Sequence, residues 1–549
     1  MILPRVKMRK DKKGVFQNII RYYGKSEFSE NAINLIKHFS PDIKCEKDSD
    51  PNFFLTKDNF EVKGTYKLTV SESEICICYS DYEGVRNAIS TLVQLRVGDG
   101  IKCVEIFDEP DNTFRSCMLD LARGYVEIDV LKEHIIRMAM LKFSHIHLHL
   151  MDRQSYVLES DVVPNPDKHR LYTKKEMAEL IAFCKNLSLE VIPEIEIPAH
   201  AVNQIKALPE LGCDIIDKKK AIDAIKNLDN PRKREFTDNK KGVSSWVVCA
   251  GKETTYAIFE EIIKEVLEIF DGPYIHIGGD ELEFTHLGAH PHWDNCRYCT
   301  KKMEEENISD LRGLYYYVIR RVYDTVKSFG RKMIMWNDQL DVFNPIDIPK
   351  DIIIEFWNGN VITKERGTYQ KLLEQGFETI NAECHYCYVD FPQYMREEKI
   401  TRWNTHKEYV GDRKLDGKII GGEMCAWELG NPLYSFYPYS LPVCMTLFAD
   451  RVWNNDIFIY DDEYKKSAFS VMVGVYDRNI NPFSSFKEFI PPRDINKNML
   501  EDIELDSISL DELSGELSKM KKIKAPSVYG KNTLDAYIGC LEDIENILK

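Results

Sequence analysis

Two adjacent acids, Asp280 and Glu281, follow a short apolar run that ends in Gly278 and Gly279. The run Pro273–Ile277 indicates a buried strand, and the glycines leave room for a ligand to approach the backbone. Carboxylates just beyond a buried strand suit acid–base chemistry, because burial and mutual repulsion can raise the pKa of one of them. An isolated Asp-Glu pair is more often a solvated turn, so the prediction depends on what the other strands carry.

The acids belong to a pattern of strands and helices between residues 111 and 455. Apolar runs alternate there with amphipathic helix patterns such as Leu131–Leu141, which argues for a parallel sheet covered by helices. Eight such units predict an α/β fold, a (β/α)8 TIM barrel with insertions. A doubly wound open sheet is the alternative, but the sequence has no glycine-rich phosphate loop. The strand candidates are Cys117–Leu121, His145–Leu150, Glu190–Ile195, Tyr274–Ile277, Lys332–Trp336, Ile352–Trp357, Thr379–Ala382 and Ile419–Cys425.

Different patterns flank and interrupt the barrel. Residues 1–110 predict a small α+β domain, with strands at Gly64–Val70 and Ile75–Tyr79 and helical spacing at Val15–Tyr23. Residues 456–549 predict a mostly helical C-terminal extension that packs on the rest. A lysine-rich insertion at residues 204–248 is expected to form a long loop over the barrel mouth.

The composition bounds the class of protein. The 549 residues are 44% hydrophobic and 30% charged, which is typical of a globular chain with two or three domains. A net charge of −16 argues against nucleic-acid or membrane-surface binding. We expect no transmembrane helix and no signal peptide. The fifteen cysteines are scattered through apparent core segments, which favours free thiols and a reducing, cytoplasmic location.

Polar and aromatic residues gather where the predicted strands end, which is where barrel enzymes place their active residues. Tryptophan faces stack on the C–H faces of a pyranose ring, and acids and arginine bind its hydroxyls. A single tryptophan is more often a core residue, but three of the seven fall at strand ends. The pattern therefore predicts a carbohydrate site. Its candidate residues are Arg115, Asp120, Asp152, Glu194, His200, Trp336, Trp357, Tyr388, Trp427 and Glu428.

The ordered strand-end motifs resemble those of the family 20 glycoside hydrolases, the β-N-acetylhexosaminidases. The resemblance runs from about residue 60 to about residue 455 and includes the small domain before the barrel. The motifs are Arg115–Arg123, His147–Asp152 followed by Gln154, Ile192–Ala201 and His276–Glu281.

The resemblance implies a retaining exo-glycosidase in which the substrate's own 2-acetamido oxygen attacks the anomeric carbon. Glu281 would then be the general acid and base. Asp280 would orient the acetamido N–H and stabilise the oxazolinium intermediate, and Tyr388 would donate to the acetamido oxygen. Asp152 and His200 would form the pair that links to the acid.

The resemblance also implies a binding pocket for a terminal HexNAc sugar. Trp336, Trp357 and Trp427 would wall it, Arg115 would hold ring hydroxyls, and Glu428 would bind the O4 and O6 hydroxyls. Glu428 follows Trp427 directly, whereas the family has one spacer residue, which leaves the C4 preference open. A homo-oligomer is also left open, since a neighbouring subunit could close such a pocket.

Three further departures from the family motifs keep alternatives open. Arg153 stands where a small acid or amide is usual, and Glu196 and Ala199 replace Asp and Gly. One alternative is a glycosidase for a modified or disaccharide HexNAc unit. Another is a catalytically silent sugar-binding protein, against which the intact Asp280, Glu281 and Tyr388 weigh.

A second constellation, His290, His292, Cys296 and Cys299, has the residue types of a tetrahedral zinc site. Its His-x-His-x3-Cys-x2-Cys spacing is not a standard one, and the family needs no metal. A loop with incidental thiols is therefore favoured, and we expect neither a metal nor a cofactor.

Overall fold

The computed structural model describes the chain apart from certain segments. These are residues 25–27, 165–170, 218, 220–236, 239–242, 245, 283–292, 359–367, 390–396, 409–412, 428–440, 456–457, 459, 474–509, 525–533, 536–537, 540–541, 543–544 and 547–549. Within the described residues, no helix is both long and apolar enough to cross a membrane.

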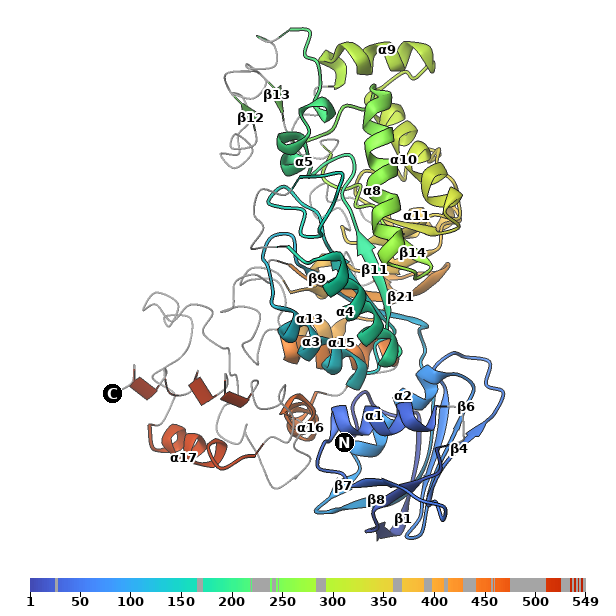
Figure 1. The fold of residues 1–549 in the computed structure, drawn as a ribbon, viewed down its shortest axis with the longest axis vertical. Helices are drawn as coiled ribbons and strands as arrows, with labels where there is room; N and C mark the ends of the chain where they lie inside the picture. Colours follow the sequence, from blue (N-terminus) through green and yellow to red (C-terminus); the bar gives the residue numbers. More distant parts are fainter. Residues whose placement is uncertain are drawn as a thin grey trace.

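The first part of the chain forms an eight-stranded sheet in the order β1-β8-β5-β6-β4-β2-β3, with β7 paired to β8. Helix α2 packs on β5 and β6 with one side and on barrel helix α3 with the other, so it lies between the sheet and the barrel (Figure 1). The elements are β1 Met8–Phe16, β2 Ile20–Tyr22, α1 Ser29–Phe39, β3 Cys45–Lys47, β4 Phe53–Lys57, β5 Tyr66–Val70, β6 Ile75–Tyr79, α2 Tyr82–Val93, β7 Arg96–Val97 and β8 Gly100–Asp108.

One sequence prediction in this part is wrong. Val15–Tyr23 has helical apolar spacing, but it forms the end of β1 and the whole of β2. Gly14, at φ 99°, lies within a register shift between Asp11 and Val15 in the pairing of β1 with β8, and Ile20 pairs with Cys45. Tertiary strand pairing thus overrides a short periodic pattern that fits either structure.

All eight predicted barrel strands are present, and the sheet closes because β21 pairs in parallel with both β17 and β9. The TIM barrel prediction is therefore confirmed. The last strand of the first sheet ends at Asp108, and the barrel begins at Phe114. The strands are β9 Phe114–Asp120, β10 His145–His149, β11 Glu190–Glu194, β14 Tyr274–His276, β15 Lys332–Trp336, β16 Ile353–Phe356, β17 Thr379–Asn381 and β21 Ile419–Ala426.

Helices cover the outside of the barrel. Helix α4 begins with a capping box, in which the Thr173 side chain accepts from Glu176 N and the Glu176 side chain accepts from Thr173 N. Helix α10 is capped by Asp310, whose side chain accepts from Gly313 N. The covering helices are α3 Ile128–Met140, α4 Lys174–Asn186, α8 Glu253–Ile269, α10 Leu311–Ser328, α11 Thr368–Glu374 and α15 Leu441–Trp453.

The insertions lie at the end of the barrel away from the first sheet, where Figure 1 shows α5, β12, β13 and α9. They contain α5 Val202–Ala207, η1 Pro209–Leu211, β12 Thr237–Asp238, β13 Val243–Ser244, η2 Trp293–Asn295 and α9 Arg297–Glu305. The later elements are α12 Cys384–Cys387, β18 Tyr388–Val389, α13 Glu397–Arg402, β19 Lys407–Glu408 and β20 Arg413–Lys414, then α16 Asp462–Val473 and α17 Leu510–Met520 of the C-terminal region.

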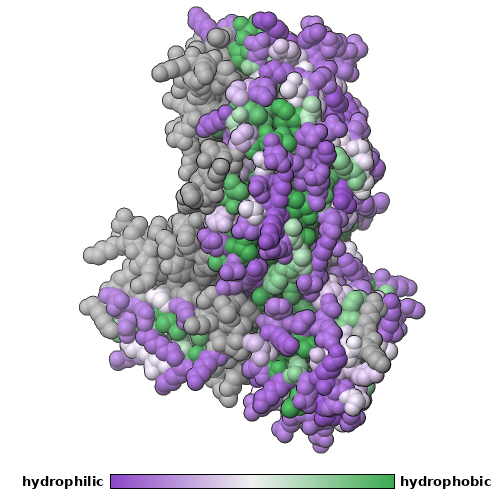
Figure 2. All heavy atoms as spheres, in the orientation of Figure 1, coloured by the Kyte–Doolittle hydropathy of each residue, from purple (hydrophilic) through white to green (hydrophobic). Residues whose placement is uncertain are grey.

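Apolar side chains fill the space between the barrel and its helices, while the outer face in Figure 2 is mostly hydrophilic with small hydrophobic patches. The barrel interior is unusually charged, because histidines and glutamates of several strands point into it. His147 Nδ1 lies 2.7 Å from Glu423 Oε1, and His276 Nδ1 lies 2.9 Å from Glu194 Oε1. Close polar pairing of this kind makes the burial of ionisable groups tolerable.

Candidate active site

The predicted catalytic residues meet at the carboxyl ends of β10, β11 and β14. His200 stands at the centre. Its Nδ1 lies 3.2 Å from Asp152 Oδ2, and its Nε2 lies 3.5 Å from Asp280 Oδ2 and 3.4 Å from Glu281 Oε2. The structure therefore brings four of the five predicted catalytic residues into one contact network.

The backbone around the acids adopts conformations that side chains usually avoid. Glu281 has φ 49° and His200 has φ 55°, both in the left-handed region. Gly278 has φ 64°, and a Cβ added there would lie 1.8 Å from Glu196 Oε2. The glycine of the motif is therefore required by a close approach of Glu196, and the strain at Glu281 is typical of a functional position.

Glu281 is held through its backbone while its side chain stays accessible. Its N–H donates to Asp338 Oδ2 over 2.9 Å, and its carbonyl accepts from Trp246 Nε1 over 3.2 Å. Its side chain is 31% exposed, against 4% for that of His200. The carboxyl group is thus positioned by buried neighbours and open to a ligand.

The network holds His200 as a cation. Burial would lower the pKa of His200, but the Asp152 and Asp280 carboxylates outweigh it and raise that pKa well above its usual value. Burial likewise opposes ionisation of Asp152, yet Arg123, His200 and His149 hold the pKa of Asp152 well below its usual value. The alternating charges run from Arg123 through Asp152 and His200 to the two acids.

Other carboxyl groups beside the acids have raised pKa values. Burial and the charge of Asp280 raise the pKa of Asp338 to about 7. The same two causes raise the pKa of Glu196 well above its usual value. Asp280 Oδ1 is buried and has no hydrogen-bond partner among the described residues. It is therefore an acceptor beside the site that a ligand could still satisfy.

Trp336 and Glu194 form the floor of the site. Trp336 is 1% exposed, and its Nε1 donates to Glu194 Oε1 over 2.8 Å. Glu194 also contacts His149 and His276. Burial would raise the pKa of Glu194, but His149, His276 and His147 hold it well below its usual value.

Aromatic rings form one side of the site. Trp427 lies 6.1 Å from Trp336 and 5.8 Å from Tyr388 between ring centroids, and Trp357 stacks on Tyr388 at 5.9 Å. The guanidinium of Arg123 lies over the Trp427 ring at 4.9 Å from its centroid. Partly exposed Trp357 and Trp427 offer flat apolar surface of the kind that a sugar ring covers.

The expectation that Arg115 binds the ligand is wrong. Arg115 leaves the amino end of β9, is 1% exposed, and donates to Glu83, to Lys142 O at 2.9 Å and to Asn112 O at 2.6 Å. The role was implied by the family resemblance alone, because the predicted strand Cys117–Leu121 already left Arg115 at the amino end, where β9 begins at Phe114. Arg123, at the opposite end of the same motif, occupies the site instead.

Three residues of the site escaped the sequence analysis. Asp338 follows Trp336 by two residues, so its place beyond a strand end was a usable signal. Trp246 stacks near His200 at 4.5 Å between centroids, but it lies at the end of the lysine-rich insertion, where nothing marked it. Arg123 was visible only as part of a motif. Glu428, His290 and His292 lie outside the described residues.

Several histidine and carboxylate groups are close enough to bind a metal, but those of the barrel interior already pair with one another. One is His147, Glu194 and His276, and another is His149, Glu194 and Glu196. A third kind of group lies in the insertions and consists of cysteines only. Its members are Cys213, Cys249, Cys296 and Cys299.

The model of the glycosyl hydrolase family 20 catalytic domain matches residues 113–431 of the chain. A β-hexosaminidase of Porphyromonas gingivalis is 29% identical over 252 residues, which cover 43% of this chain and 29% of that protein. A β-hexosaminidase of Vibrio furnissii is 28% identical over 368 residues, which cover 62% of this chain and 55% of that protein. A β-hexosaminidase of Akkermansia muciniphila is 24% identical over 431 residues, which cover 71% of this chain and 81% of that protein. The chain thus spans about a third and about half of the first two relatives.

Solved structures show the same fold. The β-N-acetylhexosaminidase of Bacteroides fragilis superposes with a TM-score of 0.70 at 22% identity, covering 87% of this chain and 96% of that one. A mutant β-hexosaminidase of Streptomyces plicatus, solved with its GlcNAc product, has a TM-score of 0.66 at 18% identity, covering 87% and 95%.

Proposed function

The chain belongs to glycosyl hydrolase family 20, and from this premise we propose that it is a retaining exo-β-N-acetylhexosaminidase. It would hydrolyse terminal β-linked GlcNAc or GalNAc by substrate-assisted catalysis. The observation that carries the proposal is the Asp280–Glu281 pair at the end of β14, with Glu281 Oε2 3.4 Å from a buried, cationic His200.

Glu281 is the proton carrier in this mechanism. The acetamido oxygen of the substrate attacks the anomeric carbon, the bond to the leaving oxygen breaks, and Glu281 gives its proton to that oxygen. The Glu281 carboxylate then takes a proton from the water that attacks the same carbon and opens the oxazolinium ring. Its partly exposed side chain and fixed backbone support this double role.

Asp280 serves the acetamido group. Its buried Oδ1, without a partner among the described residues, suits the N–H of that group. An anion there also stabilises the positive charge that develops on the oxazolinium ring. Tyr388, in the aromatic wall beside Trp357 and Trp427, would donate to the acetamido oxygen.

Arg123, Asp152 and His200 position the acids. Arg123 Nη2 lies 2.7 Å from Asp152 Oδ2, which in turn contacts His200 Nδ1. The cationic His200 stabilises the Glu281 carboxylate that remains after proton transfer. Arg123 is also the cation nearest the aromatic wall among the described contacts, so it takes over the hydroxyl-binding role first given to Arg115.

Glu281→Gln tests the role of the acid. The variant should fold like the wild type but lose roughly 10²–10⁴-fold in kcat on an aryl β-N-acetylglucosaminide with a poor leaving group, because the amide cannot transfer a proton. Glu374→Gln, at an exposed position of α11, is the matched control and should keep full activity. A wild-type hydrolysis rate in Glu281→Gln would show that Glu281 is not the general acid.

Substrate assistance has its own test. The wild type should hydrolyse aryl β-N-acetylglucosaminides or galactosaminides and leave the plain aryl β-glucoside intact, because only the former carry the nucleophile. Efficient cleavage of the glucoside would instead indicate an enzyme carboxylate as nucleophile. No hydrolysis of any aryl glycoside, with retained binding of GlcNAc, would favour a sugar-binding protein.

A further inference from the structure

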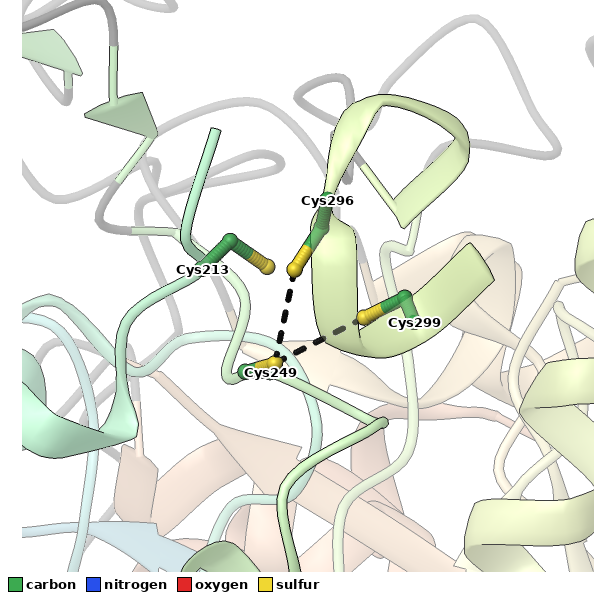
Figure 3. Close-up of side chains that lie close together, drawn as sticks. All are labelled: Cys213, Cys249, Cys296 and Cys299. Carbon is green, nitrogen blue, oxygen red and sulfur yellow. Dashed lines mark hydrogen bonds between the residues drawn. The ribbon is translucent and has the colours of Figure 1, made fainter. Parts of the chain in front are cut away.

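Four cysteines from three separate segments converge in the insertions above the barrel (Figure 3). Cys213 follows η1, Cys249 precedes α8, and Cys296 and Cys299 lie at the start of α9. Cys249 Sγ lies 3.6 Å from Cys296 Sγ and 3.6 Å from Cys299 Sγ. All four sulfur atoms lie within 4.8 Å of one another.

We propose that Cys213, Cys249, Cys296 and Cys299 bind one zinc ion as a closed, structural tetrathiolate site. Zinc–sulfur bonds of about 2.3 Å in a tetrahedron place the sulfur atoms about 3.8 Å apart, close to the separations seen here. A disulfide would need sulfur atoms about 2.05 Å apart. The Cys296-x2-Cys299 spacing is also a usual half of such a site.

The binding step is a ligand exchange without oxidation. Each thiol gives up its proton as its sulfur bonds to the ion, and hydrated zinc gives up its waters. Four protein ligands leave no open position, so the ion would not activate a water or polarise a substrate. The site is therefore structural, and the proposed glycosidase mechanism does not pass through it.

The backbone builds the cluster without help from the thiols. Ile215 pairs with Cys296 in an antiparallel bridge, Arg297 N donates to Asp214 O over 3.0 Å, and Cys249 N donates to Leu211 O over 2.7 Å. These contacts hold the three segments together at the level of the sulfur atoms. Preformed geometry of this kind distinguishes a site from thiols that meet by accident.

A glycine allows the segments to approach. A Cβ added to Gly251 would lie 2.2 Å from both the carbonyl carbon and oxygen of Tyr298 and 2.5 Å from Cys299 N. Any other residue would push the Cys249 segment away from the start of α9. Below them, the fully buried Trp293 donates from Nε1 to Val248 O over 2.9 Å.

The surroundings suit an anionic centre. A zinc ion with four thiolates carries two negative charges, and Cys296 is the N-cap of α9, where helix N–H groups favour such charge. The Lys252 ammonium donates to Gly212 O over 2.6 Å, next to Cys213 in the chain. Cys249, Cys296 and Cys299 are buried, which excludes water from the sulfur atoms.

The alternative is that these are ordinary buried thiols, which behave as small apolar groups. Cys117, Cys184 and Cys425 are equally buried, and each lies singly within a strand or helix of the core. Among the described residues, the cluster is the one group of metal-ligand geometry made of cysteines alone. The sequence analysis had paired Cys296 and Cys299 with His290 and His292, and the structure supplies Cys213 and Cys249 as partners instead.

The proposed ion would cross-link the insertion after β11 to the segment after β14. Cys249 lies three residues beyond Trp246, whose indole N–H donates to the carbonyl of Glu281. Val248 N donates to Pro198 O over 2.9 Å, two residues before His200. The ion would therefore fix the two segments that hold Glu281 and His200, a consequence that rests on the proposed function.

Metal analysis of the full chain, purified without a polyhistidine tag, tests the site. We expect close to one zinc per chain by inductively coupled plasma mass spectrometry. Replacement by Co²⁺ should give the visible absorption bands of a tetrahedral tetrathiolate complex. A zinc content near zero that added Zn²⁺ does not raise overturns the proposal. So does an intact mass lower by four hydrogens, which would indicate two disulfides, and so does iron in place of zinc.

Variants locate the ion. Cys296→Ser should lower the zinc content at least tenfold, whereas Cys184→Ser, a buried cysteine of α4 outside the cluster, should keep it. If Cys296→Ser does not fold, the partly exposed Cys213→Ser provides the milder change, with faster loss of zinc to a chelator. Full zinc retention in Cys213→Ser would overturn the four-ligand assignment.

The metal test is independent of the glycosidase test. Glu281→Gln should keep the zinc of the wild type although it loses hydrolysis. Zinc removal should lower the melting temperature in both proteins. Zinc bound in a chain without glycosidase activity would uphold the site and reject only the proposed function.

Discussion

Two arginines frame strand β9, and their surroundings differ. At the amino end, Arg115 is 1% exposed and directs its guanidinium to Glu83 and to backbone carbonyls. At the carboxyl end, Arg123 is 16% exposed and lies between Asp120, Asp152 and the Trp427 ring. The first cation joins strand β9 to helix α2 of the first domain. The second belongs to the charged network that runs through Asp152 and His200 to the two acids.

The difference indicates what each end of the barrel does. At the amino end, burial would raise the pKa of Glu83, but Arg115 and Arg86 hold it below its usual value. At the carboxyl end, burial and the neighbouring Asp280 carboxylate raise the pKa values of Asp338 and Glu196. Charge pairing stabilises one end, and charge repulsion is retained at the other, which is typical of a functional site.

Arg115→Met should have the largest effect on stability. It leaves Glu83 buried without its closest cation, so the free energy of unfolding should fall by about 3 kcal/mol. Denaturant titration followed by tryptophan fluorescence measures this loss, and kcat of the folded fraction should stay unchanged. A raised KM with an unchanged free energy of unfolding would indicate that Arg115 binds the substrate. The contrast between the two arginines would then be wrong.

Arg123→Met should act on catalysis instead. The loss of the cation beside Asp152 and the aromatic wall should lower kcat/KM roughly 100-fold, equivalent to about 2.7 kcal/mol. Its unfolding free energy should fall less than that of Arg115→Met, because Asp152 keeps His200 and His149 as partners. Arg123→Lys should recover only part of the activity, since lysine lacks the planar fork.

Asp338→Asn should have the smallest effect, visible as a change with pH. The folded-state pKa of Asp338 is raised from 3.8 to about 7. Between these values the unfolded chain has released a proton that the folded chain keeps, so this group lowers stability as pH rises through that window. Relative to the wild type, the variant should therefore gain stability between about pH 4 and about pH 8.

Denaturant titrations at both pH values measure this gain. Asp347→Asn, at an 81% exposed side chain, is the control and should show no such dependence. If the stability of Asp338→Asn changed with pH as steeply as that of the wild type, other carboxylates would be the source of the pH dependence. The contrast between the two ends of the barrel would then be weaker.

The sequence was sufficient to predict the eight barrel strands because they are largely buried on both faces and most read as short apolar runs between helix patterns. The acids, His200 and the tryptophans were predictable since they follow those runs directly. Arg115 was assigned to the site because its motif contains two arginines and the resemblance did not decide between them, although the strand pattern puts Arg123 at the carboxyl end and Arg115 at the amino end. Its partner Glu83 belongs to a different domain, which no local pattern reveals.

The cysteine cluster was only half visible for the same reason. Cys296 and Cys299 form a recognisable pair, but Cys249 lies 47 residues before Cys296, and Cys213 lies earlier still. His290 and His292, which are close in the sequence, were therefore taken as the other two candidate zinc ligands. Residue spacing alone does not predict ligands that tertiary structure brings together. The long lysine-rich stretch between Cys213 and Cys249 gave no sign that the two cysteines lie close in the fold.

Asp108, at the end of β8, accepts from Lys142 Nζ over 2.8 Å and from Trp453 Nε1 over 3.1 Å, and Arg5 N donates to Asp450 over 2.6 Å. The last of these contacts joins residues 445 positions apart. During synthesis the first sheet therefore leaves the ribosome long before helix α15, which completes its surroundings. The buried carboxylate of Asp108 obtains its indole donor only when nearly the whole barrel has been made, so the first domain and helix α15 must finish folding together.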